Sequence, residues 1–222
     1  MKLNNPKKII LASALLFLLS ACATFITSKA IVCANNLESS ITNFCEVNPN
    51  VLWRGAQPDE KGTAWLIEHG VQTIINLEEL HNDINTIHRA ALNTMGHYQI
   101  DYFRVKTWEP LYAFDFTQPL ADEHVVHFLA LMQYAKKPIY VHCREGQNRT
   151  GVMVAAYKII YEGTQLSSIL NEMQSYSGIW SKYTTEYLEG LANRRAEIMQ
   201  KVANKLSTLE KPTQIICNQG KC

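Results

Sequence analysis

Hydrophobic and polar positions along this chain follow two periods in turn, one typical of strands and one typical of helices. Short segments predict strands at 51–54, 71–77, 98–105 and 138–142. The segment 71–77 is rich in β-branched residues, and 98–105 alternates in the manner of a strand. Apolar residues at helical spacing predict helices at 58–69, 79–95, 121–135 and 149–162, with further helices to about residue 209. Strands that alternate with helices predict an α/β fold with a central, mostly parallel sheet flanked by helices.

The first residues have a different pattern, which is typical of an export signal. Lysines at positions 2, 7 and 8 precede an apolar stretch at 9–19, and this stretch is shorter than the roughly 20 residues that cross a bilayer. The next residues, Leu19-Ser20-Ala21-Cys22, resemble the bacterial lipobox. That resemblance implies lipid attachment at Cys22 and a periplasmic or outer-membrane location. Ordinary export with cleavage after Ala30 and a retained anchor are the alternatives.

These patterns divide the chain into four parts. We expect a signal peptide of the lipoprotein type at 1–21, a tether and lead-in at 22–48, one folded domain at 49–210 and a tail at 211–222. In an oxidising periplasm the cysteines outside the domain can pair. Cys33, Cys45, Cys217 and Cys222 allow three pairings, and the local pairs Cys33–Cys45 and Cys217–Cys222 are the simplest. Cys143 stands apart from all four.

Composition limits the classes of function. The 222 residues are 47% hydrophobic, which is enough for one sizeable core. Lys and Arg total 21 against 20 Asp and Glu, so no basic excess indicates nucleic-acid binding and no acidic excess indicates disorder.

The chemistry is concentrated where the strand at 138–142 meets the helix at 149–162. Cys143 and Arg149 enclose five residues, Arg144, Glu145, Gly146, Gln147 and Asn148. Five residues can curl into a cradle of inward backbone N–H groups, and the start of the helix adds its positive end. Such a cradle binds a tetrahedral oxyanion and favours a thiolate, and an arginine can bind two phosphate oxygens at once.

The segment His142-Cys143-(five residues)-Arg149-Thr150-Gly151 resembles the signature loop of the cysteine-dependent protein tyrosine and dual-specificity phosphatase superfamily. A second segment, Leu52-Trp53-Arg54-Gly55-Ala56-Gln57-Pro58, resembles the opening of compact members of that superfamily. The order of elements from Val51 to about Leu209 also fits, so the resemblance covers most of the chain after the export signal. The domain at 49–210 is therefore expected to be a phosphatase domain.

The resemblance implies a role for each residue of the loop. Cys143 is the nucleophile that forms a phosphocysteine, and Arg149 binds the phosphoryl oxygens. Thr150 donates a hydrogen bond to the Cys143 sulfur, and His142 orients the loop through its ring. Glu145 is structural, tying the loop to neighbouring groups, and the backbone of 144–148 lines the phosphate cradle. The resemblance implies neither a metal nor an organic cofactor.

The sequence leaves the identity of the general acid open. The superfamily usually places an aspartate on the loop before the helix that precedes the signature strand, and here that loop is 106–120. Asp115, between Phe114 and Phe116, is the leading candidate, and Glu109 is the alternative because it lies nearer the strand end. Asp122 opens the next helix, where it would interact with the helix N-terminus.

The sequence therefore predicts an exported, lipid-anchored phosphomonoester hydrolase that acts as a monomer on a phosphorylated protein or a small phosphomonoester. An inositol-phosphate phosphatase in the same fold is an alternative, although Arg144 is the only basic residue between Cys143 and Arg149. A phosphate-binding pseudophosphatase is the second alternative, and it predicts the loss of Cys143 or Arg149, both of which are present.

Overall fold

The computed structural model describes residues 40–94, 96–105, 122–176, 182–218 and 221. All of them belong to one compact unit, Ile31–Cys222. The expected lipidation site Cys22 and the loop with Asp115 and Glu109 lie outside the described residues.

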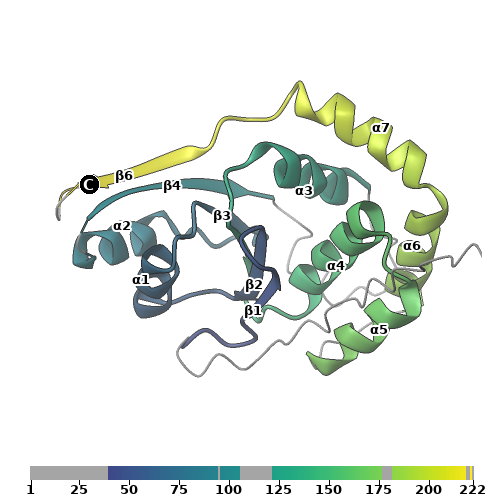
Figure 1. Ribbon diagram of the computed structural model, residues 1–222, viewed down its shortest axis with the longest axis horizontal. Coiled ribbons are helices and arrows are strands. Elements are labelled where there is room, and N and C mark those ends of the chain that lie inside the picture. Colours follow the sequence, from purple (N-terminus) through teal and green to yellow (C-terminus); the bar gives the residue numbers. More distant parts are fainter. Residues whose placement is uncertain (1–39, 95, 106–121, 177–181, 219–220, 222) are drawn as a thin grey trace, which may run out of the picture. The chain divides into compact units, whose positions relative to one another are not determined.

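A six-stranded sheet in the order β1-β2-β5-β3-β4-β6 forms the centre of this unit (Figure 1). The four inner strands are parallel: β2 pairs with β5, β5 with β3, and β3 with β4. The two edge strands are antiparallel to their neighbours. The expected α/β fold with a mostly parallel sheet is confirmed. The strands are β1 Cys45–Asn48, β2 Leu52–Ala56, β3 Thr73–Asn76, β4 His97–Arg104, β5 Ile139–Cys143 and β6 Thr213–Asn218.

Helices cover both faces of the sheet (Figure 1). α1 (Glu60–Glu68) and α2 (Ile84–Asn93) lie on one face. The other face carries the helices that follow β4, and α4 continues directly into a π-helical turn that ends at the left-handed Gly163. These helices are α3 Asp122–Tyr134, α4 Asn148–Tyr157, the turn η2 Lys158–Glu162, α5 Leu166–Ser175, α6 Lys182–Asn193 and α7 Arg195–Leu206.

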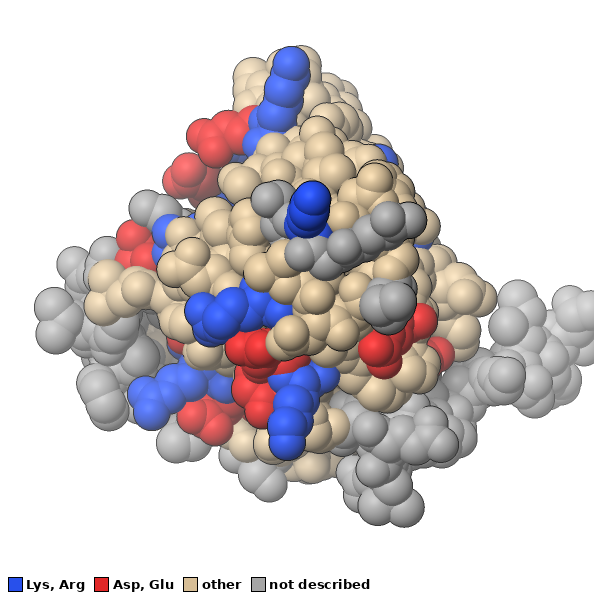
Figure 2. Space-filling model, turned by 90° about the vertical axis from the view of Figure 1, so that its left-hand side faces the viewer, with Lys and Arg blue, Asp and Glu red and all other residues tan. Residues whose placement is uncertain are grey.

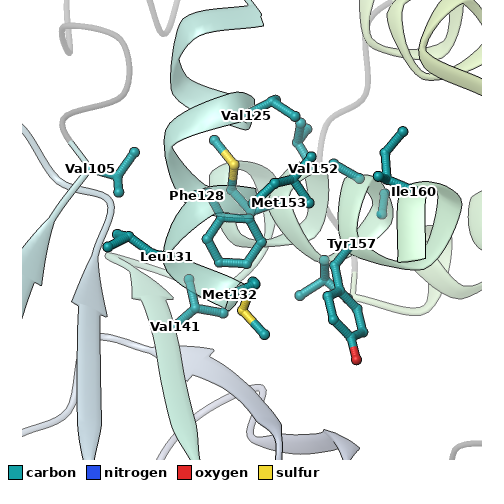
Figure 3. Packing of buried hydrophobic residues seen from close by; sticks show 14 of the residues in the cluster. Val105, Val125, Phe128, Leu131, Met132, Val141, Val152, Met153, Tyr157 and Ile160 are labelled. Carbon is teal, nitrogen blue, oxygen red and sulfur yellow. The ribbon is translucent and has the colours of Figure 1, made fainter. Parts of the chain in front are cut away.

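The core has one cluster of buried side chains on each face. Ile74 belongs to the cluster under α1 and α2, whereas Ile75 belongs to the larger cluster under α3 and α4, because successive side chains of a strand point to opposite faces. In the larger cluster Phe128 of α3 packs with Met153 of α4 and Val141 of β5 (Figure 3). This packing holds α4 against β5, so the start of α4 lies close to the end of β5.

The structure differs from the predicted elements at three places. The helix predicted at 79–95 begins only at Ile84, because Asn76 Oδ1 accepts from the Glu78 N–H and turns the chain before the helix can start. β1 and β6 lie outside the predicted domain range of 49–210 and add an antiparallel strand at each edge. β6 alternates exposed and buried residues, which is the period of a half-buried strand.

Cys45 and Cys217 are both disulfide-bonded. They lie on the opposite edge strands β1 and β6, which are roughly 24 Å apart at the spacing of neighbouring strands. A disulfide joins Cα atoms less than about 7 Å apart, so these two cysteines do not bond each other. The pairing that joins Cys45 to Cys217 is thereby excluded. The local pairs Cys33–Cys45 and Cys217–Cys222 stay a prediction.

Charged side chains of both signs are interspersed on the face seen in Figure 2, in keeping with the small net charge of the chain. Within the described residues, no helix has both the length and the apolar character needed to cross a membrane.

Candidate active site

Cys143 is the last residue of β5, an inner strand between β2 and β3. Its side chain is buried and lies on the face of the sheet that α4 covers. It is a free cysteine, in contrast to Cys45 and Cys217. A thiol at the carboxyl end of an inner parallel strand lies where α/β folds place their ligand sites.

The loop after Cys143 requires glycine at one position. Gly146 has a φ of +67°, and a Cβ there would lie 2.3 Å from the carbonyl carbon of Gly55 and 2.5 Å from the backbone nitrogen of Ala56. No side chain fits between these backbones. The absence of a side chain lets the loop rest directly on the end of β2.

Three consecutive carbonyls of this loop accept hydrogen bonds from groups outside it. The Gln57 N–H donates to Arg144 O (3.2 Å), and Asn43 Nδ2 donates to Glu145 O (2.7 Å). Arg54 Nη2 donates to Gly146 O (2.6 Å). In a trans peptide the N–H points opposite to the carbonyl of the same peptide unit. The N–H groups of residues 145, 146 and 147 therefore point away from these three donors, and the oxyanion cradle predicted for them stays a prediction.

The start of α4 contributes the second half of this site. Arg149 lies in the first turn of α4, and its Nη1 donates to Leu77 O, 3.3 Å away, just beyond the end of β3. The N-cap residue Gln147 makes no side-chain hydrogen bond to the helix. The N–H groups of this first turn and the helix dipole are thus directed at the space beside Cys143.

Two of the predicted roles differ from what the structure contains. The Glu145 side chain does not tie the loop to its surroundings: it is exposed and lies 3.4 Å from the equally exposed Arg144. The Glu145 backbone carbonyl makes the tie instead, through Asn43. The Thr150 hydroxyl is buried but has no hydrogen-bond partner among the described residues, so the expected bond to the Cys143 sulfur is not formed here.

His142 points away from Cys143 into a buried polar network on the opposite face of the sheet. Its Nε2 lies 3.0 Å from Asp83 Oδ2, in the segment just before α2. Asn76 Nδ2 and the Tyr102 hydroxyl also donate to Asp83, at 2.7 and 3.2 Å. Burial alone would raise the pKa of Asp83, but the nearby His142 and His81 and the hydrogen bond from Tyr102 hold it below its usual value. The network fixes the ring of His142, and the role of that ring in orienting the loop stays a prediction.

The structure describes only one of the three acid candidates. Asp122 accepts hydrogen bonds from Tyr187 of α6, from Arg194 just before α7 and from Lys201 of α7. Arg194 is the main reason that the pKa of Asp122 lies well below its usual range. A carboxylate that stays ionised has no proton to donate, so this environment favours a helix-linking role for Asp122 over that of a general acid. Across the described part of the chain, no group of three His, Cys, Asp or Glu side chains could hold a metal ion.

Comparison with known proteins agrees with this geometry. Residues 23–189 match a family model described as a DSP-PTPase phosphatase fused to NAD+ kinase. The chain belongs to this family. The expected membership of the tyrosine and dual-specificity phosphatase superfamily is confirmed by this match and by the fold.

The curated relatives of this phosphatase family include much longer proteins. Chloroplastic NAD kinase 2 of Oryza sativa subsp. japonica is 30% identical over 161 residues, which are 70% of this chain but 15% of that protein. The dual specificity protein phosphatase TpbA of Pseudomonas aeruginosa is 38% identical over 55 residues, which are 24% of this chain and 25% of that protein.

Solved structures share the fold of this phosphatase domain. TpbA of P. aeruginosa superimposes with a TM-score of 0.55 at 23% identity, over 71% of this chain and 91% of that one. The core catalytic domain of the PP-IP phosphatase SIW14 from S. cerevisiae gives a TM-score of 0.58 at 16% identity, over 77% and 97%.

Residues outside the signature loop also support the site, and sequence reasoning missed them. Arg54 belongs to a motif that was recognised, and a charged residue in the middle of an otherwise apolar strand was a signal that it has a partner. Asp83 fell within a predicted helix, and Asn43 fell within the predicted tether. Asn43 has a φ of 56°, a conformation that asparagine tolerates better than most residues, but nothing in the sequence linked it to residue 145.

Proposed function

We propose that this chain is a phosphomonoester hydrolase of the tyrosine and dual-specificity type that works through a phosphocysteine intermediate. The observation that carries the proposal is Cys143, a free and buried cysteine at the end of β5. The loop that follows has three backbone carbonyls hydrogen-bonded to residues outside it, and Arg149 lies at the end of that loop. The family match and the fold support phosphatase activity.

The proposed reaction has two steps. In the first, the Cys143 thiolate attacks phosphorus in line: an S–P bond forms as the O–P bond to the leaving alkoxide breaks. In the second, water attacks phosphorus, the S–P bond breaks, and Cys143 leaves as a thiolate with inorganic phosphate released. The backbone N–H groups of the loop and Arg149 bind the phosphoryl oxygens in both steps. The buried Thr150 hydroxyl has no partner among the described residues, and in the proposed second step it turns to donate to the departing sulfur.

The leaving alkoxide needs a proton in the first step. We propose that Asp115 supplies it, with Glu109 as the alternative. The lowered pKa of Asp122 and its three hydrogen-bond donors support this assignment, since they disfavour the third candidate. No metal or organic cofactor enters the proposed reaction.

We propose a phosphorylated protein or a small phosphomonoester as the substrate. An inositol phosphate is the second candidate, because the fold is shared with a PP-IP phosphatase. Highly phosphorylated rings require many cations, whereas the loop adds only Arg144, whose side chain is exposed beside Glu145. A panel of phosphopeptides and inositol phosphates separates these substrate classes.

The test of the proposed function is turnover of para-nitrophenyl phosphate by Cys143→Ser. Serine keeps the size of the side chain but is a far weaker nucleophile at neutral pH. We expect turnover to be lost while phosphate or vanadate still binds. Turnover within about tenfold of the wild type would reject Cys143 as the nucleophile.

A further inference from the structure

The segment Arg54-Gly55-Ala56-Gln57 contacts the signature loop at each end. Arg54 Nη2 donates to Gly146 O at 2.6 Å, and the Gln57 N–H donates to Arg144 O at 3.2 Å. Between them the backbone of Gly55 and Ala56 lies against Gly146. The proposed chemistry assigns no role to this segment.

Arg54 is an unusual residue for its position. It is 1% exposed, and it lies on β2 opposite Val141 of β5, two residues before Cys143. Since strand side chains alternate, Arg54 and Cys143 are on the same face of the sheet. A fully buried guanidinium is costly unless it is paired, so its partners indicate its purpose.

The partners of Arg54 hold its guanidinium in one plane. The guanidinium carbon lies 3.7 Å from the centroid of the Tyr176 ring, just beyond α5, in a cation–π contact. Glu172 of α5 is close enough to act on Arg54 electrostatically, and it also pairs with the buried Lys158. While the face of the guanidinium stacks on the Tyr176 ring, Nη2 at its edge donates to Gly146 O.

Charge links Arg54 to the nucleophile as well. Burial lowers the pKa of Arg54, while four ionisable groups raise it through the negative charge that they carry when ionised. They are Tyr176 and Glu172 from the α5 region and Cys143 and Tyr140 from β5. Cys143 is thus close enough for the positive charge of Arg54 to act on its side chain.

We propose that Arg54 is a positioning residue of the phosphatase reaction, which holds the Gly146 carbonyl outward so that the next N–H faces the phosphoryl oxygens. This inference rests on the proposed function. Arg54 does not touch the substrate. It acts through the backbone of the loop and through its positive charge beside Cys143.

Two variants of Arg54 in the full chain separate geometry from charge. Arg54→Met removes both, and we expect kcat/KM for para-nitrophenyl phosphate to fall by roughly 10- to 100-fold, as for the loss of a charge-assisted hydrogen bond. The inhibition constant for vanadate should rise by a similar factor, and the acidic limb of the pH–rate profile should move to higher pH. Arg54→Lys keeps the charge but not the planar fork, so kcat/KM should fall while the acidic limb stays near its wild-type position.

A third variant tests the same idea at a partly exposed position. Asn43→Gly removes the donor to Glu145 O, and glycine keeps the left-handed backbone. We expect a smaller loss, roughly three- to tenfold in kcat/KM, with weaker vanadate inhibition. This variant is informative even where Arg54→Met fails to fold.

The matched control is Arg195→Met. Arg195 also donates to a backbone carbonyl, that of Ile160 at 2.9 Å, at the far end of the α4–η2 helix. Its loss should lower the thermal unfolding midpoint and leave kcat/KM within about twofold of the wild type.

The inference is overturned by a folded Arg54→Met variant whose kcat/KM and vanadate inhibition stay within about threefold of the wild type. It is equally overturned where Arg54→Met does not fold and both Arg54→Lys and Asn43→Gly behave as the wild type. In either case an inactive Cys143→Ser would leave the proposed function intact. Full turnover by Cys143→Ser would instead reject the function itself.

Discussion

Arg149 lies between the N-terminal end of α4 and the end of β3. Its Nη1 donates to Leu77 O at 3.3 Å, and this contact orients the guanidinium beside the loop. A lysine at this position keeps the charge, but it cannot bind two phosphate oxygens in a fork and also reach Leu77 O.

We therefore expect Arg149→Lys to lower kcat/KM for para-nitrophenyl phosphate by roughly 100-fold or more. Steady-state kinetics of the folded variant measure this. A loss of less than about threefold would place Arg149 outside the site.

The general acid is tested by the leaving group. An alkoxide leaves poorly and needs a proton, whereas para-nitrophenolate needs little help. We expect Asp115→Asn to slow alkyl phosphates far more than para-nitrophenyl phosphate and to flatten the basic limb of the pH–rate profile. Glu109→Gln should cause a milder loss that is similar for both substrates.

Asp122→Asn is the matched control for that experiment. Its carboxylate is held by Arg194, Lys201 and Tyr187, so we expect reduced stability and no preference between good and poor leaving groups. A leaving-group effect in Glu109→Gln and not in Asp115→Asn would transfer the role to Glu109. An effect in neither would mean that water or substrate supplies the proton.

At the scale of elements, the network around Asp83 joins the start of α2 to β3, β4 and β5. Asp83 contacts His142 of β5, Asn76 of β3 and Tyr102 of β4 through buried hydrogen bonds. We expect Asp83→Asn to lower the free energy of unfolding at pH 7 by about 2 kcal/mol, the range of hydrogen bonds to a charged group. Denaturant unfolding measures this.

The pH dependence of that loss follows from the sign of the shift. The pKa of Asp83 is lowered in the folded state, so its charged form contributes stability above the unfolded pKa, roughly 3.9. That contribution is lost as the pH falls through the folded pKa. The difference between wild type and Asp83→Asn should therefore shrink in acid, and a difference that grew would contradict this account.

Much of the fold followed from periodicity, since the four inner strands and the long helices have clear apolar patterns. The edge strands β1 and β6 did not follow from periodicity. β1 has only four residues, and β6 lies in a polar tail where just Ile215 and Cys217 are buried. The start of α2 was missed because the segment before it opens with the helix-forming residues Glu79 and Leu80. The local hydrogen bonds of the Asn76 side chain with the Glu78 N–H and His81 O show in the structure that this segment turns.

The signature loop was recognisable because its residues are consecutive in the sequence. Its supports were not, since Asn43, Arg54 and Asp83 come from segments 59 to 102 residues away. Their pairing depends on which strands are neighbours in the sheet. The sequence pattern locates the inner strands but does not give the order of strands in the sheet.

At the scale of the whole molecule, the predicted export signal and the disulfides are consistent with each other. Disulfides at Cys45 and Cys217 suit an oxidising compartment, which is where a lipoprotein signal would deliver the chain. We propose that the protein is exported and anchored by lipid at Cys22. Ala23 after it, and not aspartate, resembles lipoproteins that are sent to the outer membrane.

Metabolic labelling with a clickable fatty acid tests the anchor. We expect the wild type to be labelled and Cys22→Ala not to be labelled, because a lipobox has no other acceptor for the diacylglyceryl group. Equal labelling of both proteins, or of neither, would reject lipid attachment at Cys22.

The most direct measurement of the central claim is the covalent intermediate itself. The wild type is mixed with para-nitrophenyl phosphate, quenched in denaturant during turnover and analysed by peptide mass spectrometry. We predict one phosphoryl group on the peptide that contains Cys143, on its sulfur, and none on the matching peptide of Cys143→Ser. A phosphoryl group on another residue, or turnover without any phosphoenzyme and undiminished in Cys143→Ser, would contradict a phosphocysteine mechanism.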